Sequence, residues 1–442
     1  MPSLLESLKT LLRAGPRDAP ALCQALGISQ PTFSRLWKQP GAGIVRIGQA
    51  RASRYALLRP LGQLGTTLPL FRVGQGGGTD AYGALTMLYP HWFLFAPHDG
   101  GRPELIEGLP YFLQDLRPQG FLGRLAPRLH PELNLPQDIL LWSDDDVLLW
   151  AARRGEDAAG NLIVGNESLA RFLRAESAPT VGEASRDAAY PALAERANLG
   201  TVDAGSSAAG EQPKFTACVA RRDGSSEHVI VKFSPPVDTS NGRRWADLLI
   251  AEHLALCTLQ DHGIAACGTQ IVAAGQRVFV EAIRYDRQGS RGRSPVATLA
   301  ALDGITGAAD RNWTACAELL AEQARLGEID TRAVATLDVF GFLIGNNDRH
   351  HGNLAFFWSD DGTLALAPVY DMLPMLYRPN AQGEIIARQV DLSPLDRLDL
   401  RFLPQAHGMA CDFWQRVVDD ERISADFRRI ASNHAAAIEA IR

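Results

Sequence analysis

The chain has 442 residues, of which 46% are hydrophobic and 21% charged, and its formal net charge is −6. This length exceeds what one hydrophobic core can serve, so we expect two or three domains with the composition of a soluble globular protein. The sequence has no run of 18 apolar residues and no basic leader ahead of an apolar stretch, which argues against membrane and secreted classes and favours the cytoplasm. The six cysteines form no Cys-x-x-Cys pair, as suits buried thiols in a reducing compartment.

The N-terminal segment is basic, whereas the rest of the chain is acidic. Residues 1–60 hold nine Lys and Arg against two Asp and Glu, a net of +7, so the remaining residues carry −13. Apolar spacing, glycine turns and a Ser N-cap predict three helices and then two short strands, over 3–14, 18–26, 29–38, 43–48 and 54–58. A short helix, a glycine turn, a capped basic helix and two strands together predict a winged helix-turn-helix over 1–60.

An anionic partner fits this basic module, and DNA is the partner that the helix-turn-helix pattern favours. Five polar side chains of the third helix would then face the major groove: Gln30, Thr32, Ser34, Arg35 and Lys38. Three arginines of the wing would meet phosphates: Arg46, Arg51 and Arg54. The alternative is a helical protein-interaction module whose basic face is solvated.

Residues 61–200 carry fewer signals. The glycine run at 74–78 lacks the strand-turn-helix context of a phosphate loop, so we predict a connection there. The apolar run at 92–95 predicts a strand, and the three aspartates at 144–146 predict a solvated helix start in preference to a metal site. The polar stretch at 176–187 is predicted to be an exposed connector.

A second informative region begins with a loop of small residues at 203–215. Small residues let backbone amides approach phosphate oxygens closely. An apolar strand then ends at Lys232, and Glu252 follows 20 residues later in a helix predicted over 245–259. In a protein kinase, a strand Lys contacts the nucleotide phosphates and a helix Glu orients it. A surface Lys and a solvated Glu are the alternatives.

The polar run around Asp348 and Asn353 carries the strongest chemical signal. Asp348 is followed five residues later by Asn353, and Asp371 lies 18 residues beyond. In kinases the first Asp accepts the proton of the substrate hydroxyl, and the Asn and second Asp hold magnesium. Two apolar stretches within 354–367 predict a hairpin with an Asp-Gly turn at 361–362. Such a hairpin would bring Asn353 and Asp371 together.

The segment before this run predicts the connection between two lobes. A strand starting at Arg277 leads into the polar linker 284–287, which corresponds to a kinase hinge whose backbone reads adenine. Residues 288–294, rich in Gly, Arg and Ser, are predicted to be mobile. From about Thr298 onward, the pattern is mostly helical apart from the hairpin.

Taken together, these motifs resemble the HipA family of bacterial toxin kinases over about residues 65–430. The matching segments occur in family order: the Ser-x-Ala-Gly-x-Gln-x-Lys loop at 207–214, Val231-Lys232, Tyr285-Asp286-Arg287, the run from Asn347 to Asn353, and Tyr370-Asp371. The attached N-terminal module departs from the basic family plan and is similar to the HipH subgroup.

The resemblance implies a two-lobed α+β kinase fold: a β-rich N-terminal lobe with a HipA-type subdomain over 61–285 and a helical lobe over 286–442. It implies an ATP- and Mg²⁺-dependent serine/threonine protein kinase that acts as the toxin of a toxin–antitoxin system. Asp348 would be the catalytic base, Asn353 and Asp371 would bind magnesium, and Ser207 would be autophosphorylated. The residues implied in nucleotide binding are Ala209, Gly210, Glu211, Gln212, Pro213, Lys214, Lys232, Glu281, Ala282, Ile283, His350, His351, Gly352, Asn353, Tyr370 and Asp371.

The implied partners are a protein substrate, such as an aminoacyl-tRNA synthetase, an antitoxin, and DNA through the N-terminal module. Two other functions stay open on the sequence alone. One is a DNA-binding transcriptional regulator whose kinase-like body only senses nucleotide. The other is a kinase of small molecules, because related catalytic loops also serve such enzymes.

Overall fold

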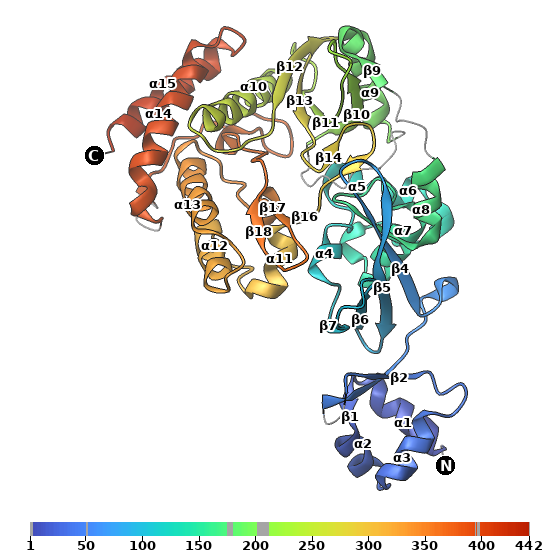
Figure 1. Cartoon of the computed structure of the whole chain (residues 1–442). Helices are drawn as coiled ribbons and strands as arrows, with labels where there is room; N and C mark the ends of the chain where they lie inside the picture. The colour runs from blue at the N-terminus through green and yellow to red at the C-terminus, as the bar shows by residue number, and fades with distance from the viewer. Residues whose placement is uncertain are drawn as a thin grey trace.

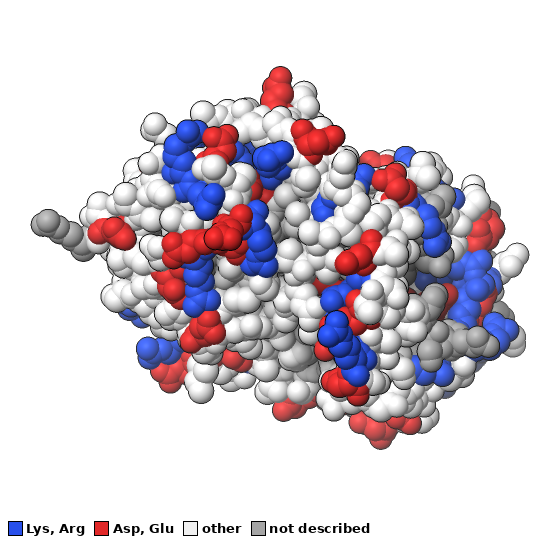
Figure 2. All heavy atoms as spheres, turned by 90° about the horizontal axis from the view of Figure 1, so that it is seen from above, with Lys and Arg blue, Asp and Glu red and all other residues white. Residues whose placement is uncertain are grey.

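The structure is a computed structural model that describes residues 3–49, 52–174, 180–200, 212–393, 395 and 398–441. Figure 1 shows the N-terminal module at one end, a middle region of strands and short helices next to it, and a β-rich and a helical region at the other end. On the face seen in Figure 2, Lys and Arg are interspersed with Asp and Glu, unlike the excess of positive charge in residues 1–60. Among the described residues, no helix is both long and apolar enough to span a membrane.

The first 60 residues form three helices and a three-stranded sheet around their own core. The helices are α1 (Leu4–Arg13), α2 (Ala19–Leu26) and α3 (Gln30–Trp37), and the sheet has the order β1 (Arg17–Asp18), β3 (Arg54–Leu57), β2 (Ile44–Ile47). Ser3, Asp18 and Ser29 cap the helices through their side chains. These elements confirm the predicted ones. Strand β1 was not foreseen, because two residues are too short to show a pattern.

The middle region is a five-stranded antiparallel sheet with helices beside it. Its strand order is β7 (Glu104–Glu107), β6 (Trp92–Pro97), β5 (Thr79–Leu88), β4 (Thr67–Val73), β8 (Leu162–Val164). Its helices are α4 (Tyr111–Gln114), α5 (Gly120–Gly123), α6 (Ala126–Leu129), α7 (Asp144–Arg154) and α8 (Gly165–Arg174). The glycine run connects β4 to β5 as predicted, and a capping box between Ser143 and Asp146 begins α7, which confirms the helix start.

A second five-stranded sheet follows, and each of its faces is covered by a helix. Its strand order is β12 (Thr269–Ala274), β13 (Arg277–Ile283), β11 (Ser226–Phe233), β10 (Lys214–Ala220), β9 (Thr180–Gly182). Helix α9 (Arg186–Asn198) packs Tyr190 and Ala194 against Val229 and Val231, and α10 (Ser240–Asp261) contacts β11, β12 and β13. The predicted connector is wrong for 180–187, because β9 pairs with β10 there and α9 begins at Arg186.

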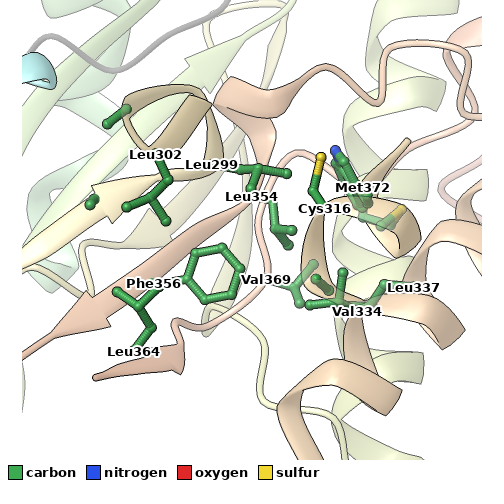
Figure 3. Close-up of a cluster of buried hydrophobic side chains, with 14 of the residues drawn as sticks. Leu299, Leu302, Cys316, Val334, Leu337, Leu354, Phe356, Leu364, Val369 and Met372 are labelled. Carbon is green, nitrogen blue, oxygen red and sulfur yellow. The ribbon is translucent and has the colours of Figure 1, made fainter. Parts of the chain in front are cut away.

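The C-terminal region is mostly helical, as expected. It contains α11 (Leu299–Thr306), α12 (Trp313–Glu322), α13 (Glu328–Leu343), α14 (Leu403–Asp419) and α15 (Ala425–Glu439), and a small sheet of β16 (Val296–Thr298), β17 (Ala355–Trp358) and β18 (Leu364–Leu366). Figure 3 shows Leu302, Leu337, Leu354, Phe356 and Met372 gathered in the core next to this sheet. The polar loop that contains Asp348 and Asn353 therefore rests on packed apolar side chains.

The linker between the second five-stranded sheet and the C-terminal region is a packed hairpin, in place of the mobile segment predicted over 288–294. Strands β14 (Arg287–Gln288) and β15 (Gly292–Arg293) pair, and both β15 residues are buried. A Cβ on Gly292 would lie 1.8 Å from the Gln75 carbonyl oxygen, so the close approach to the β4–β5 loop requires glycine. Composition alone could not reveal this contact between distant segments.

Candidate active site

The polar loop that follows α13 is held by its own side chains. Asn346 Oδ1 accepts a hydrogen bond from the Asp348 amide at 3.0 Å, and Asn353 Nδ2 donates to the Asp348 carbonyl at 2.9 Å. Arg349 Nε lies 3.1 Å from the buried Asp338 Oδ1, which ties the loop to α13. These bonds fix the backbone on both sides of Asp348, while Asp348 lines an open cleft of about 1230 Å³.

The β17–β18 hairpin brings Asn353 and Asp371 to that same cleft, as the spacing predicts. The turn lies at the predicted Asp-Gly pair, where Gly362 has a φ of +84° that favours glycine. The Tyr370 hydroxyl donates to the Gly352 carbonyl at 2.7 Å and closes the base of the hairpin. An amide and a carboxylate that are distant in sequence thus border one cleft with Asp348.

Lys232 joins this group from the second sheet. Its Nζ lies 2.6 Å from Glu252 Oε1 on α10 and also contacts the Asp371 carboxylate. Lys232 and Glu252 are only 6% and 1% exposed, so the pair is a buried one. The predicted pairing of Lys232 with Glu252 is therefore confirmed, and the alternatives of solvated positions are wrong.

A smaller cavity of about 120 Å³ shares Lys232 and Asp371 with the cleft. Tyr285 and Tyr370 stack at its edge with ring centroids 5.7 Å apart and an interplanar angle of 27°. Apolar side chains that line it come from the second five-stranded sheet and from the small C-terminal sheet, among them Ile230, Ala282, Ile283, Val296 and Ala355. A narrow apolar slot beside a polar cleft suits a flat aromatic base attached to a charged group.

Comparison with known proteins gives this site a family. Residues 206–439 match the family described as a HipA-like C-terminal domain, and residues 64–173 match the middle domain of a YjjJ-like toxin. The chain is 39% identical over 433 residues to the toxin YjjJ of Escherichia coli K12, covering 97% of this chain and 96% of that protein. The chain belongs to the HipA-like family of toxins.

The HipA-like fold is also seen in a solved structure. HipA of Shewanella oneidensis MR-1, determined with HipB and its operator DNA, is similar with a TM-score of 0.50 and 14% identity, over 84% of this chain and 96% of that one. At this identity, the likeness shows the fold alone. The expected mixed α+β HipA-like fold is confirmed, whereas membership of the HipH subgroup stays a prediction.

The predicted nucleotide loop of this HipA-like chain is only partly described. Ser207, Ala209, Gly210 and Glu211 lie outside the described residues. The three following positions, Gln212, Pro213 and Lys214, line the large cleft. Gln212 lines this cleft, and its Nε2 is buried and has no hydrogen-bond partner among the described residues.

The side chain of Glu281 does not line either cavity, so its predicted nucleotide contact, through the backbone of the hinge, stays a prediction. Glu281 pairs with Val231 in the β11–β13 register, so strand alternation directs both side chains towards α9. There Glu281 accepts hydrogen bonds from the Tyr190 hydroxyl at 2.5 Å and from Arg186 and Arg221 at 3.0 and 2.5 Å. The next two residues of β13 line the smaller cavity, as predicted.

His351 is likewise directed into the protein and away from both cavities. Its Nδ1 lies 2.6 Å from Asp303 Oδ1, and its Nε2 lies 2.8 Å from the Arg311 carbonyl oxygen. Its side chain therefore holds the loop against α11, and its predicted nucleotide contact stays a prediction. His350 lines the large cleft and Gly352 lines the smaller cavity, where their predicted contacts remain open.

The predicted magnesium ligands fit a hard cation. Asn353 Oδ1 is buried without a hydrogen-bond partner among the described residues, and the neighbouring Asp371 carboxylate borders the same cleft. No group of three or more His, Cys, Asp or Glu placed to hold a metal occurs in the described part of the chain. An Asn and an Asp would therefore need further oxygen ligands, and nucleotide phosphates are the usual ones in kinases.

No pattern in the sequence predicted that the middle region is bonded to the linker. Arg284 forms two hydrogen bonds of 3.0 Å to the Asp286 carboxylate, and Arg287 bonds Asp286 Oδ2 at 2.6 Å and Asp157 Oδ1 at 2.9 Å. The Gly160 amide also donates to Asp286 at 3.0 Å. Burial alone would raise the pKa of Asp286, but the two arginines hold it well below its usual range.

Three middle-region residues line the smaller cavity together with the linker, namely Asp115, Gln119 and Ala159. Asp115 accepts hydrogen bonds from the Thr298 amide and hydroxyl at 2.6 and 2.7 Å, at the start of α11. The polar linker motif was visible in the sequence, but its partners lie more than 120 residues away. Only tertiary structure could bring them together.

The predicted DNA-contacting side chains share the outer surface of α3. Gln30, Arg35 and Lys38 are exposed, and Thr32 and Ser34 are half-buried, because Phe33 and Leu36 occupy the core face. The predicted wing is partly covered, since Ile47 and Ala56 pack against Leu88 of the middle region. Arg46 donates to Ser53 Oγ at 2.9 Å and Arg54 is exposed, whereas Arg51 lies outside the described residues.

Proposed function

We propose that this HipA-like toxin is an ATP- and Mg²⁺-dependent serine/threonine protein kinase of a toxin–antitoxin system. The observation that carries the proposal is the meeting of Asp348, Asn353, Asp371 and Lys232 around one cleft. These four groups come from a loop, a hairpin and a separate sheet, so their convergence has no simple structural reason. Phosphoryl transfer needs positioning and charge neutralisation, which such a set supplies.

Each residue would have a definite task in the transfer. Asp348 would accept the proton of the substrate hydroxyl as its oxygen bonds to the γ-phosphorus and the bond to the ADP oxygen breaks. Lys232, oriented by Glu252, would neutralise phosphate charge. Asn353 and Asp371 would hold magnesium, which when bound neutralises charge on the phosphate oxygens. The adenine base of ATP would lie in the smaller apolar cavity.

The first test is incubation of the purified chain with Mg²⁺ and ATP, followed by intact and peptide mass measurement. We expect phosphate within residues 205–214, on Ser207, in the wild-type chain. Asp348→Ala should fold yet gain no phosphate, and Ser207→Ala should lose the label from this loop. An Asp348→Ala variant that keeps most of the phosphorylation activity would refute the assignment of Asp348 as the catalytic base.

A second candidate is a DNA-binding transcriptional regulator whose kinase-like body only senses nucleotide. It is favoured by the exposed Gln30, Arg35 and Lys38 of the basic N-terminal module. ATP binding without phosphate transfer to the chain or to any protein would support it.

We propose DNA as a partner of α3 in either case, and an antitoxin as a further partner. A kinase of small alcohols would instead phosphorylate those compounds in the same assay.

A further inference from the structure

The cleft that contains Asp348 is larger than a nucleotide needs. Its volume of about 1230 Å³ lies above the range of ordinary small-molecule pockets, roughly 300–1,000 Å³, and the separate 120 Å³ cavity offers a place for the base. One side of the cleft is formed by residues 117–142, which we call the middle-region bank. The other side is formed by residues 375–388, which we call the C-terminal bank. The space between the banks has room for a polypeptide segment.

The middle-region bank presents two adjacent leucines to solvent. Leu140 lines the cleft and is 87% exposed, and Leu141 is 71% exposed. Their neighbours Ile139 and Trp142 are each 4% exposed and anchor the turn in the core. Leu140 is an exposed large apolar side chain on the cleft that Asp348 also lines, and a partner's apolar side chain would cover Leu140 and the adjacent Leu141 favourably.

This turn is held in one conformation. Asp138 Oδ1 accepts a hydrogen bond from the Leu140 amide at 3.0 Å, and Trp142 Nε1 donates to the Pro136 carbonyl at 2.8 Å. Arg117, on the same bank, donates to the Trp142 carbonyl and pairs with Asp144 at 2.8 Å. A surface that is already ordered loses little conformational entropy when a partner binds.

The C-terminal bank carries two arginines, Arg378 and Arg388. Arg388 donates to the Leu376 carbonyl at 2.6 Å, which fixes its position at the cleft. No carboxylate lies within ion-pair distance of either guanidinium in the part of the chain that the structure describes. Among the residues of the two banks that line the cleft, one is a carboxylate, Asp138, and four are arginines, Arg117, Arg124, Arg378 and Arg388, so the outer cleft attracts acidic groups.

We propose that this cleft docks a polypeptide segment that presents an apolar side chain to Leu140 and Leu141 and an acidic side chain to Arg378 and Arg388. The acceptor serine or threonine lies between them, at Asp348. This proposal deepens the proposed kinase function, since it names the substrate class of the same cleft. It also assigns the choice of substrate to the middle region as well as to the helical region.

The test uses synthetic peptides with one central serine and one position randomised at a time. Binding of fluorescent peptides to the full chain is measured without ATP, and phosphorylation of the same peptides is measured with Mg²⁺ and ATP. We expect Leu, Ile, Met or Phe to be selected at one position and Asp or Glu at another. The double variant Leu140→Ser with Leu141→Ser should lower binding of apolar peptides about tenfold, and Arg378→Glu should abolish the acidic preference.

Leu173→Ser is the matched control, because Leu173 is 53% exposed on α8 and does not line the cleft. It should leave both preferences unchanged. Peptide binding that is indifferent to sequence, or preferences that survive in the double variant, would overturn the docking proposal. Selective binding without phosphorylation would support the docking site and count against the proposed kinase function only. Displacement of the peptides by short RNA, with no effect of the leucine variants, would overturn the proposal in favour of nucleic acid.

Discussion

Asp371 has an unusual backbone conformation at the position that we propose binds magnesium. Its φ is +53°, in the left-handed region that most side chains avoid, although Asp adopts it more readily than most. The Asp371 carboxylate contacts Lys232, and its carbonyl accepts a bond of 3.5 Å from Asn346 Nδ2. Backbone strain of this kind is characteristic of residues that are held for function.

Two substitutions at Asp371 separate strain from chemistry. Asp371→Ala and Asp371→Gly both remove the carboxylate, so we expect both to abolish phosphorylation. Asp371→Gly should be more stable than Asp371→Ala by about 1 kcal/mol, because glycine adopts a positive φ without a Cβ clash. Denaturant unfolding of both variants measures this difference. Equal stabilities would show that the backbone conformation relaxes at no cost.

His434 predicts a pH dependence of stability. It is 1% exposed, accepts a hydrogen bond from the Tyr377 hydroxyl at 2.7 Å and donates to the Leu343 carbonyl at 2.9 Å. Burial lowers its pKa to about 4. Above pH 6.5 the imidazole is neutral in both states, and its contribution is constant. Between pH 6.5 and about 4 only the unfolded chain binds the proton, so stability falls as the pH falls, by roughly 3 kcal/mol in total.

The free energy of unfolding, measured between pH 7 and 4.5, checks this expectation. Wild-type stability should fall more steeply with decreasing pH than that of His434→Gln, by up to about 1.4 kcal/mol per pH unit. His407, which is half-buried on α14, serves for the control variant His407→Gln. An identical slope in wild type and His434→Gln would mean that His434 titrates alike in the folded and unfolded chain.

At the scale of elements, the linker is the feature that departs most from its sequence pattern. A polar stretch followed by glycine and arginine predicts mobility. In the structure this stretch forms a hairpin, and its Arg287 takes part in a buried ion pair with Asp286. Burial lowers the pKa of Arg293 to about 9, and the nearby Arg287 contributes in the same direction. The linker therefore has its conformation imposed by the middle region.

Asp286→Asn tests this dependence. The change leaves Arg284 and Arg287 buried beside a neutral amide, which should destabilise the fold by about 3 kcal/mol or more. The matched control is Asp360→Asn, whose partner Arg72 and own side chain are much more exposed, so a loss below about 1 kcal/mol is expected. Denaturant unfolding compares the two. Losses of equal size would show that the linker pair is no better isolated from water than a surface pair.

At the scale of the whole molecule, the middle region joins the other parts at separate points. Asp157 bonds the linker at 2.9 Å, Asp115 bonds the start of α11 at 2.7 Å, and Arg72 bonds Asp360 of the β17–β18 turn at 2.8 Å. Arg72 also lies over the Tyr82 ring, 4.3 Å from its centroid. The middle region thus lines the smaller cavity and contacts the turn of the β17–β18 hairpin.

For the N-terminal module we predict DNA binding that does not depend on the cleft around Asp348. If α3 contacts DNA, binding should weaken steeply between 50 and 200 mM salt. Arg35→Ala with Lys38→Ala should reduce the slope of log affinity against log salt by about 0.9 for each lost phosphate contact, and leave phosphorylation unchanged. Arg429→Ala, an exposed arginine on α15, is the control. DNA binding that does not depend on salt, or no DNA binding at all, would favour the alternative of a protein-interaction module.

The sequence by itself determined most of the elements and predicted the chemistry of the candidate site. Caps, periodicity and an Asp-Gly turn are local signals, and they predicted α1 to α3 and the β17–β18 hairpin. The spacing of kinase-type motifs predicted the roles of Asp348, Lys232 and Asp371. Only the tertiary structure decided which face of β13 Glu281 occupies and what surrounds the linker. Strand register and pairing between distant segments depend on packing across the whole chain, which no local pattern encodes.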